Sequence, residues 1–254
     1  MQELIRRNAP AAAPVSRSVR RRVLWKRDMG ENMNQFRAVL FDMDGVLINT
    51  EPLHFRMWRE VFHNRGVEID YNGYKDCIGT TEEFLRELIW KNYGADFRKD
   101  ETLKEDAMVI KKRLIAEEGF PKMPGVEEML KNLYEAGFLL AIASSSSVSF
   151  IELAMDYIGV KQYFHVINSG ENVAHSKPAP DIYLNTAERL GVKPEECVVL
   201  EDSENGSIAA VSAGMVCVGL LNPDSGNQNL ERAKVVIREL GEFTPKLIGR
   251  LNEI

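Results

Sequence analysis

The sequence predicts an α/β protein in which helices cover both faces of a parallel sheet and an all-helical segment is inserted after the first strand. Two observations predict this class. From Phe36 onward, short apolar runs alternate with helical patterns. Between residues 51 and 118 the strand-like runs are missing, and charged and helix-forming residues dominate. A chain of 254 residues is long enough for one core and a smaller inserted domain.

The expected elements follow from their residue patterns. A short apolar run indicates a buried strand, whereas apolar residues spaced three and four apart indicate a helix. The predicted strands are 38–41, 138–143, 165–168, 197–200, 216–220 and 235–237. The predicted helices are 52–64, one that begins at 81, 101–118, 126–135, 150–158, 181–190 and 207–213.

Helix-end signals support the helices of the inserted segment. Pro52 fits the first turn of a helix, because its missing N–H would have no partner there. Gly66 ends the same helix. Thr81 begins the next one, whose apolar face includes Leu85 and Ile89. These signals predict helices rather than strands for the insertion.

Three regions follow from the pattern, and they differ in composition. They are a basic extension at 1–34, an α/β core at 35–50 and 119–254, and the helical insertion at 51–118. The extension shows no sustained period, so we expect it to be disordered. Its Arg and Ser content resembles a transit peptide, and the alternative is a later natural start at Met29 or Met33.

Charge and cysteine usage exclude several classes of protein. The whole chain has a net charge of −6 although its first 34 residues are basic, so the remainder is strongly acidic. An acidic body argues against nucleic acid as a partner. No apolar run reaches the ~18 residues that a membrane helix needs. The 3 cysteines lie far apart and form no Cys-x-x-Cys pair. We therefore expect a cytoplasmic monomer that binds neither nucleic acid nor a membrane.

Polar side chains follow four of the predicted strands. The carboxyl ends of parallel strands meet at one edge of a sheet, where open α/β proteins carry their chemistry. The residues at these ends are Asp42, Asp44, Ser144, Lys177, Glu201 and Asp202. Four polar strand ends are hard to obtain by chance, so we expect these side chains to share a site.

The residue types at this edge point to one chemistry. Converging carboxylates repel one another unless a cation lies among them, and oxygen ligands without Cys or His select Mg²⁺. A serine hydroxyl and a lysine ammonium can hold a phosphate. One carboxylate can attack phosphorus while a second transfers the proton. These residues therefore predict phosphoryl chemistry with Mg²⁺ on a small phosphorylated substrate.

The segments that carry these residues resemble the four motifs of the haloacid dehalogenase (HAD) superfamily. They are Asp42-Met43-Asp44-Gly45-Val46-Leu47, Ser144, Lys177-Pro178 and Glu201-Asp202-Ser203. The resemblance is to the branch of β-phosphoglucomutase-like sugar-phosphate phosphatases and covers residues 36–240. Asp-x-Asp-Gly alone is a weak signal, but four motifs in order are specific. The resemblance implies a Rossmann-like core with a helical cap inserted after the first strand.

The resemblance also implies a role for each carboxylate. Asp42 is the nucleophile and a Mg²⁺ ligand. Asp44 is the general acid and base, and its main-chain carbonyl also binds the metal. Asp202 binds Mg²⁺, and Glu201 either binds it directly or supports the groups that do.

The phosphoryl group is expected to be held by Ser144 and Lys177, with Lys177 also balancing the charge of the nucleophile. Ser145 is a further candidate. The alternative for the serines is helix capping, because serine is a preferred residue there.

The cap is expected to contribute Thr80 and Thr81, which lie in a segment that resembles the substrate loop of this branch. His54 matches a position near the hinge and the acid/base. Trp58 shares the helix face of His54, and its alternative is packing inside the cap.

Two positions depart from the phosphomutases of this branch, which carry basic residues there to hold a second phosphate. They are Glu82 and Ser147. Arg86 lies one helical turn after Glu82, and we expect the two to form a surface pair. We therefore expect a phosphatase that acts on a sugar phosphate through an aspartyl-phosphate. The alternatives are a phosphomutase and a non-catalytic protein that binds phosphorylated metabolites.

Overall fold

Six strands form one sheet in the order β3-β2-β1-β4-β5-β6, and every neighbouring pair is parallel. The computed structural model describes residues 35–78, 80–226 and 228–254, so the expected extension at 1–34 lies outside the described residues. The strands are β1 (Ala38–Phe41), β2 (Leu139–Ser144), β3 (Val166–Ser169), β4 (Cys197–Glu201), β5 (Val216–Leu220) and β6 (Val235–Ile237). The predicted parallel sheet is confirmed.

Helices surround this sheet and form the insertion after β1. Those of the core are α6 (Val126–Glu135), α7 (Val148–Tyr157), α8 (Asp181–Leu190), α9 (Glu204–Ser212) and α10 (Pro245–Arg250). Those between β1 and α6 are α2 (Glu51–His63), α3 (Tyr71–Tyr74), α4 (Glu82–Tyr93) and α5 (Leu103–Glu118). Short 3-10 turns are η1 (Lys75–Cys77), η2 (Lys161–Tyr163), η3 (Gly170–Asn172), η4 (Pro194–Glu196) and η5 (Leu240–Glu242).

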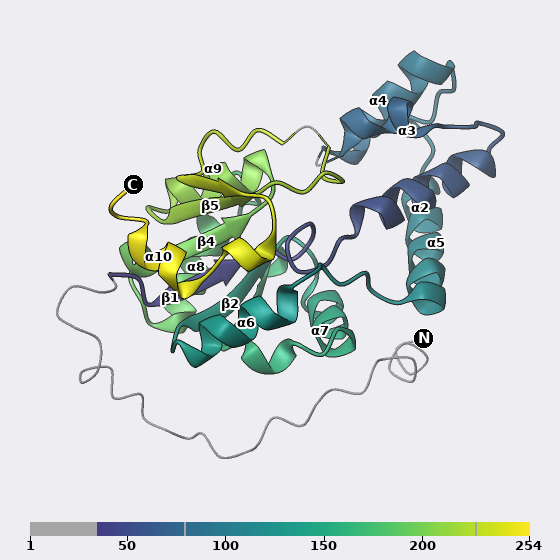
Figure 1. Cartoon of the computed structure of the whole chain (residues 1–254). Coiled ribbons are helices and arrows are strands. Elements are labelled where there is room, and N and C mark those ends of the chain that lie inside the picture. The colour runs from purple at the N-terminus through teal and green to yellow at the C-terminus, as the bar shows by residue number, and fades with distance from the viewer. Residues whose placement is uncertain (1–34, 79, 227) are drawn as a thin grey trace.

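The sheet is buried on both faces because its strands are apolar at successive positions. Ala38 and Leu40 of β1 pack in a cluster with α8 and α9. Val39 and Phe41 point to the opposite face, as the pleat requires, and pack in a cluster with α6, α7 and α10. Figure 1 shows the helices on either side of the sheet.

The inserted helices form a separate layer beside the carboxyl edge of the sheet (Figure 1). The long helices α2 and α5 pack against each other, and α3 contacts α4. Phe62 and Ile89 are fully buried in this layer. We refer to α2 through α5 as the cap. No helix within the described ranges is long and apolar enough to cross a membrane.

Serine caps explain two differences between the structure and the predicted helix boundaries. The hydroxyl of Ser147 accepts from the main-chain N–H of Phe150, so α7 begins before the predicted residue 150. Ser203 does the same for Gly206, and α9 begins at Glu204 instead of 207. A capping side chain satisfies an N–H that the first helical turn leaves free.

Candidate active site

A buried lysine bridges two carboxylates at the carboxyl edge of the sheet. Lys177 Nζ lies 2.5 Å from Asp42 Oδ1 and 2.6 Å from Glu201 Oε1. Asp42 follows β1 and Glu201 ends β4, so this ammonium ties together two neighbouring strands. The side chain of Lys177 is 8% exposed and that of Glu201 is 0% exposed. A buried charge needs its partners close by, so this bridge holds Asp42 in one position.

Glu201 is the carboxylate for which the sequence left two roles open, direct metal binding or support of the groups that bind the metal. Its Oε1 accepts from Lys177 and, at 2.7 Å, from the hydroxyl of Tyr183. Its Oε2 accepts from the hydroxyl of Ser203 at 3.0 Å and from the main-chain N–H of Asp202 at 3.1 Å. Since protein donors engage both oxygens, the structure favours support of Lys177 over direct binding of a metal.

Gly45 explains why a glycine completes the Asp-x-Asp-Gly motif. Its φ is +82°, a region that side chains other than glycine rarely adopt. A Cβ atom at Gly45 would lie 1.9 Å from Asp202 Oδ2. The glycine therefore lets the loop after β1 approach the carboxylate that follows β4.

Asp44 is held from two sides. The hydroxyl of Thr50 donates to its Oδ1 at 2.6 Å, and the hydroxyl of Ser146 donates to its Oδ2 at 3.1 Å. Thr50 immediately precedes the first cap helix, and Ser146 follows β2. The carboxyl group of Asp44 therefore has a fixed orientation toward the cavity that it lines.

Burial and mutual repulsion dominate the electrostatics of this edge. Burial, partly opposed by Lys177, raises the pKa of Asp42 to about 7. Burial and repulsion from Glu201 and Asp42 hold the pKa of Asp202 well above its usual range. Burial also acts against ionised Glu201, but Lys177 outweighs it and lowers the pKa of that carboxyl. The raised pKa values of Asp42 and Asp202 mean that the positive charge of Lys177 does not compensate all the carboxylates at this edge.

These donors fit a hard divalent cation. Asp42 and Asp202 are 9% and 6% exposed, and both carboxylates line the same cavity as Asp44. No three His, Cys, Asp or Glu side chains within the described residues form a complete metal-binding group. Without Glu201, the expected set consists of two carboxylates and the main-chain carbonyl of Asp44, and Mg²⁺ would take its remaining ligands from water and phosphate.

Except for Glu201, the predicted residues of the core line one cavity of about 940 Å³. The core contributes Asp42, Asp44, Ser144, Ser145, Lys177, Asp202, Ser203, Glu204, Asn205, Ser225 and Gln228. The cap contributes Glu51, Lys75, Asp76, Ile78, Thr80, Thr81 and Phe84. Ser144 is buried at the end of β2, and its Oγ accepts from the main-chain N–H of Ser146 at 3.1 Å.

The predicted cap residues divide into two groups. Thr80 and Thr81 line the cavity, and Thr81 also caps α4 by accepting from the main-chain N–H of Phe84. His54 is not among the lining residues in the described part of the chain. Its Nδ1 lies 3.7 Å from a carboxylate oxygen of Glu51. Trp58 stacks on Phe62 with ring centroids 5.8 Å apart, so it belongs to the cap interior.

Sequence reasoning missed residues that hold the predicted ones. Tyr183 holds Glu201, and Ser225 and Gln228 contact Asp202. Ser225 could have been found from the sequence, because it is a polar residue after the predicted strand at 216–220, at the edge where the other site residues were expected. Tyr183 lies inside an amphipathic helix, where nothing in the pattern distinguishes a hydrogen-bonding tyrosine from a core residue.

Comparison with known proteins gives one family. A family model described as haloacid dehalogenase-like hydrolase matches residues 36–214. Hexitol phosphatase B of Escherichia coli (strain K12) is 34% identical over 220 residues, which are 85% of this chain and 98% of that protein. Beta-phosphoglucomutase of Bacillus subtilis (strain 168) is 29% identical over 217 residues, 84% of this chain and 93% of that protein.

Solved structures show the same fold. The crystal structure of CbbY from Rhodobacter sphaeroides in complex with phosphate superposes with a TM-score of 0.66 at 29% sequence identity. The match covers 82% of this chain and 96% of that chain. The similarity therefore extends over most of this chain.

Proposed function

We propose that this chain, which belongs to the haloacid dehalogenase-like hydrolase family and is a phosphoric monoester hydrolase, is a Mg²⁺-dependent phosphatase of a small phosphorylated carbohydrate. One observation carries the proposal. Asp42, Asp44, Ser144, Lys177 and Asp202 come from four segments far apart in sequence and line one cavity. Related proteins named hexitol phosphatase and phosphorylated carbohydrates phosphatase support the substrate class.

In the first half of the proposed reaction, a carboxylate oxygen of Asp42 attacks the phosphorus atom. The bond between phosphorus and the ester oxygen breaks, and Asp44 donates its proton to the departing oxygen. Lys177 holds the other oxygen of Asp42 and adds positive charge near the phosphoryl group. The products are a free alcohol and an aspartyl-phosphate at Asp42.

In the second half, Asp44 takes a proton from a water molecule, which attacks the aspartyl-phosphate. The bond between phosphorus and Asp42 breaks, and inorganic phosphate is released. Thr50 and Ser146 keep the carboxyl group of Asp44 in place for both proton transfers. Mg²⁺, when bound by Asp42, Asp202 and the carbonyl of Asp44, neutralises charge on the phosphoryl oxygens.

The cavity lining supports a substrate with one phosphate and a neutral, hydroxyl-rich leaving group. Besides the proposed catalytic groups it contains Glu51, Asp76 and Glu204. Carboxylates accept hydrogen bonds from hydroxyl groups and repel a second phosphate. Among the described lining residues the cations are Lys75 and Lys177, and Lys177 is already engaged by two carboxylates.

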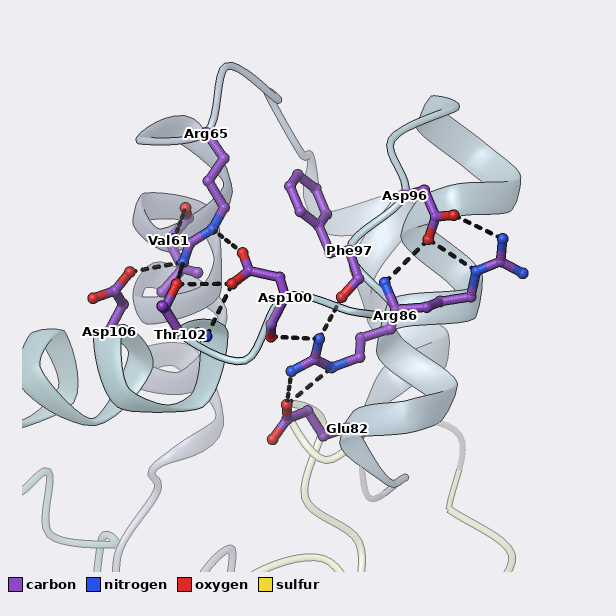
Figure 2. A network of polar contacts seen from close by, with 10 residues as sticks. Val61, Arg65, Glu82, Arg86, Asp96, Phe97, Asp100, Thr102 and Asp106 are labelled. Carbon is purple, nitrogen blue, oxygen red and sulfur yellow. Dashed lines mark hydrogen bonds and ion pairs between the residues drawn. The ribbon is translucent and has the colours of Figure 1, made fainter.

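Arg86, the basic residue nearest to Glu82 in the helix, is bound within the cap (Figure 2). Its Nη2 donates to Glu82 Oε1 at 2.5 Å, and its Nη1 donates to the carbonyl oxygens of Phe97 and, at 2.9 Å, of Asp100. The side chain of Arg86 is 13% exposed, so the expected surface pair is a half-buried network. This network supports a phosphatase over a phosphomutase, because Glu82 would repel a second phosphate and Arg86 is engaged by acceptors within the cap.

A phosphate-release screen tests the proposal. Sugar phosphates, polyol phosphates and nucleotides are supplied with Mg²⁺, with EDTA, or with Ca²⁺ after EDTA. We expect release from a sugar or polyol phosphate with Mg²⁺, none in EDTA, and little with Ca²⁺, whose looser coordination disturbs in-line geometry. Full activity in EDTA, or no release from any monophosphate, would contradict the proposal. A cytoplasmic location and a monomeric state stay predictions from the sequence.

A further inference from the structure

The segment after β5 touches the proposed metal carboxylate. We call Leu221–Gly226 together with Gln228 the β5 loop. The hydroxyl of Ser225 donates to Asp202 Oδ2 at 2.6 Å. The side-chain amide of Gln228 donates to the main-chain carbonyl of Asp202 and, at 3.1 Å, to that of Leu220. The β5 loop therefore binds both the side chain and the main chain of Asp202.

The carboxylate of Asp202 is enclosed on the side that Ser225 contacts. A Cβ atom at Gly45 would lie 1.9 Å from Asp202 Oδ2, so the same oxygen is confined between Gly45 and the Ser225 hydroxyl. No residue in the described part of the chain donates to Asp202 Oδ1. A carboxylate fixed through one oxygen presents the other to a metal ion in a defined direction.

The β5 loop is also tied to the segment between Asp44 and the cap. Asn222 Nδ2 donates to the carbonyl of Gly45 at 3.2 Å. Asn49 Nδ2 donates to Asp224 Oδ2 at 2.7 Å. Asn49 lies two residues before the first cap helix, so the loop is linked to the point where the chain enters the cap.

On its other side the β5 loop meets the cap itself. Gly226 has a φ of +67°, and a Cβ atom there would lie 2.9 Å from Ile78 Cβ and 3.1 Å from the carbonyl oxygen of Lys75. Lys75 and Ile78 belong to the cap segment that precedes the cavity-lining Thr80. Backbone and cap approach too closely here for any side chain larger than that of glycine.

We propose that Ser225 is a positioning residue for the metal carboxylate Asp202, and that the contact at Gly226 makes this positioning depend on a seated cap. The inference rests on the proposed function, in which Asp202 binds Mg²⁺. Coupling of this kind is reciprocal: if a seated cap strengthens Mg²⁺ binding, Mg²⁺ also favours the seated cap.

The first test measures Mg²⁺ binding without substrate. The rise in melting temperature with Mg²⁺ concentration gives an apparent Kd for the resting protein. Ser225→Ala should raise this Kd roughly tenfold, as loss of a partner to a metal ligand commonly does. Ser225→Thr keeps the hydroxyl and should restore most of the affinity. Ser212→Ala, the same change at an exposed position of α9, should leave the Kd unchanged.

The second test addresses the cap contact. Gly226→Ala should weaken Mg²⁺ binding about as much as Ser225→Ala, although it removes no polar group. Gly191→Ala is the matched control, because Gly191 has a φ of +70° but a Cβ atom there would meet no other atom within 4 Å. Both variants place an alanine at a similar positive φ, so a difference between them reports the contact with the cap.

The results distinguish the metal role of Asp202, the positioning role of Ser225 and the dependence on the cap. If wild-type protein shows no Mg²⁺-dependent stabilisation, the metal role of Asp202 fails, and this inference fails with it. If wild-type protein binds Mg²⁺ and Ser225→Ala binds it equally well, the positioning role is wrong while the proposed function stands. If Gly226→Ala and Gly191→Ala give equal Kd values, the dependence on the cap is wrong.

Discussion

The carboxyl edge of the sheet and the cap both contain a cation paired with two carboxylates, but these ion pairs have different roles. In both regions a half-buried or buried cation joins carboxylates from distant parts of the chain. Lys177 joins Asp42 to Glu201 beside the cavity, whereas Arg65 joins Asp100 to Asp106 within the cap (Figure 2). The difference lies in what surrounds each cation.

At the edge of the sheet, carboxylates outnumber cations and face a cavity. The pKa values of Asp42 and Asp202 are raised there, because burial disfavours the charged form of both. In the cap, the hydrogen bond from Arg65 lowers the pKa of Asp100 to about 2. The comparison teaches that uncompensated carboxylates around a cavity indicate a reactive site, whereas carboxylates that are fully paired with arginine stabilise the fold.

The largest expected effect comes from Asp42→Asn. An amide cannot act as the nucleophile, so turnover should fall by roughly three orders of magnitude or more. The matched change in the cap is Asp106→Asn, which removes one partner of Arg65 and should leave turnover within about twofold. Steady-state phosphate release of both purified variants provides the measurement. More than a few per cent of wild-type turnover in Asp42→Asn contradicts the aspartyl-phosphate mechanism.

Removal of Lys177 from the edge of the sheet and of Arg86 from the cap gives the next largest effects. Lys177→Met leaves Asp42 and Glu201 buried without their partner and should lower the free energy of unfolding by about 3–5 kcal/mol. Arg86→Met removes hydrogen bonds to Glu82 and to main-chain carbonyls and should cost about 1–3 kcal/mol. Urea unfolding of both variants measures the free energy of unfolding and shows which substitution costs more. Equal losses would mean that the two networks do not differ as described.

The two regions should respond to pH in opposite directions. The pKa of Asp42 rises from 3.8 to about 7 on folding, so the folded protein holds a proton that the unfolded chain has lost between these values. Without metal, stability should therefore decrease by roughly 2 kcal/mol as the pH rises from 5 to 7. Asp42→Asn should flatten this dependence.

The cap should instead lose stability in acid. The lowered pKa of Asp100 means that the unfolded chain takes up its proton first, so this contribution is present above about pH 4 and is lost below it. Hydrogen exchange measured by mass spectrometry at several pH values separates the two regions. The same pH response in both would remove the electrostatic contrast.

Most of the core could be predicted from the sequence because its signals are local. The strands at 38–41 and 235–237 match β1 and β6 residue for residue, because a charged residue on each side marks where each apolar run begins and ends. The motif residues then fall at strand ends, where the parallel topology brings them together. The role of Glu201 is harder to predict, because only the structure shows that Tyr183 and Ser203 engage its oxygens.

The cap and the β5 loop could not be predicted as far. The four-residue helix α3 and the six-residue helix α10 are too short to repeat an apolar pattern over two turns, so the sequence pattern predicts neither. The network of Arg86 depends on the carbonyl oxygens of Phe97 and Asp100, whose positions follow from tertiary packing. Every residue has a main-chain carbonyl, so the sequence does not show which of them will accept a hydrogen bond.

The fate of the phosphoenzyme tests the central claim most directly: the core transfers a phosphoryl group, and the cap holds no second phosphate. The protein is supplied with β-glucose 1-phosphate, Mg²⁺ and a trace of the 1,6-bisphosphate, while free phosphate and glucose 6-phosphate are both followed. Glu82 and Ser147 stand where the phosphomutases carry basic residues, so two charge-assisted contacts to a second phosphate are missing. Their loss corresponds to ~3–6 kcal/mol of transition-state stabilisation, or roughly two to four decades in the rate of the mutase reaction. We predict that phosphate release exceeds formation of glucose 6-phosphate at least ~10-fold. Glucose 6-phosphate formed faster than phosphate is released would contradict the claim and identify a phosphomutase.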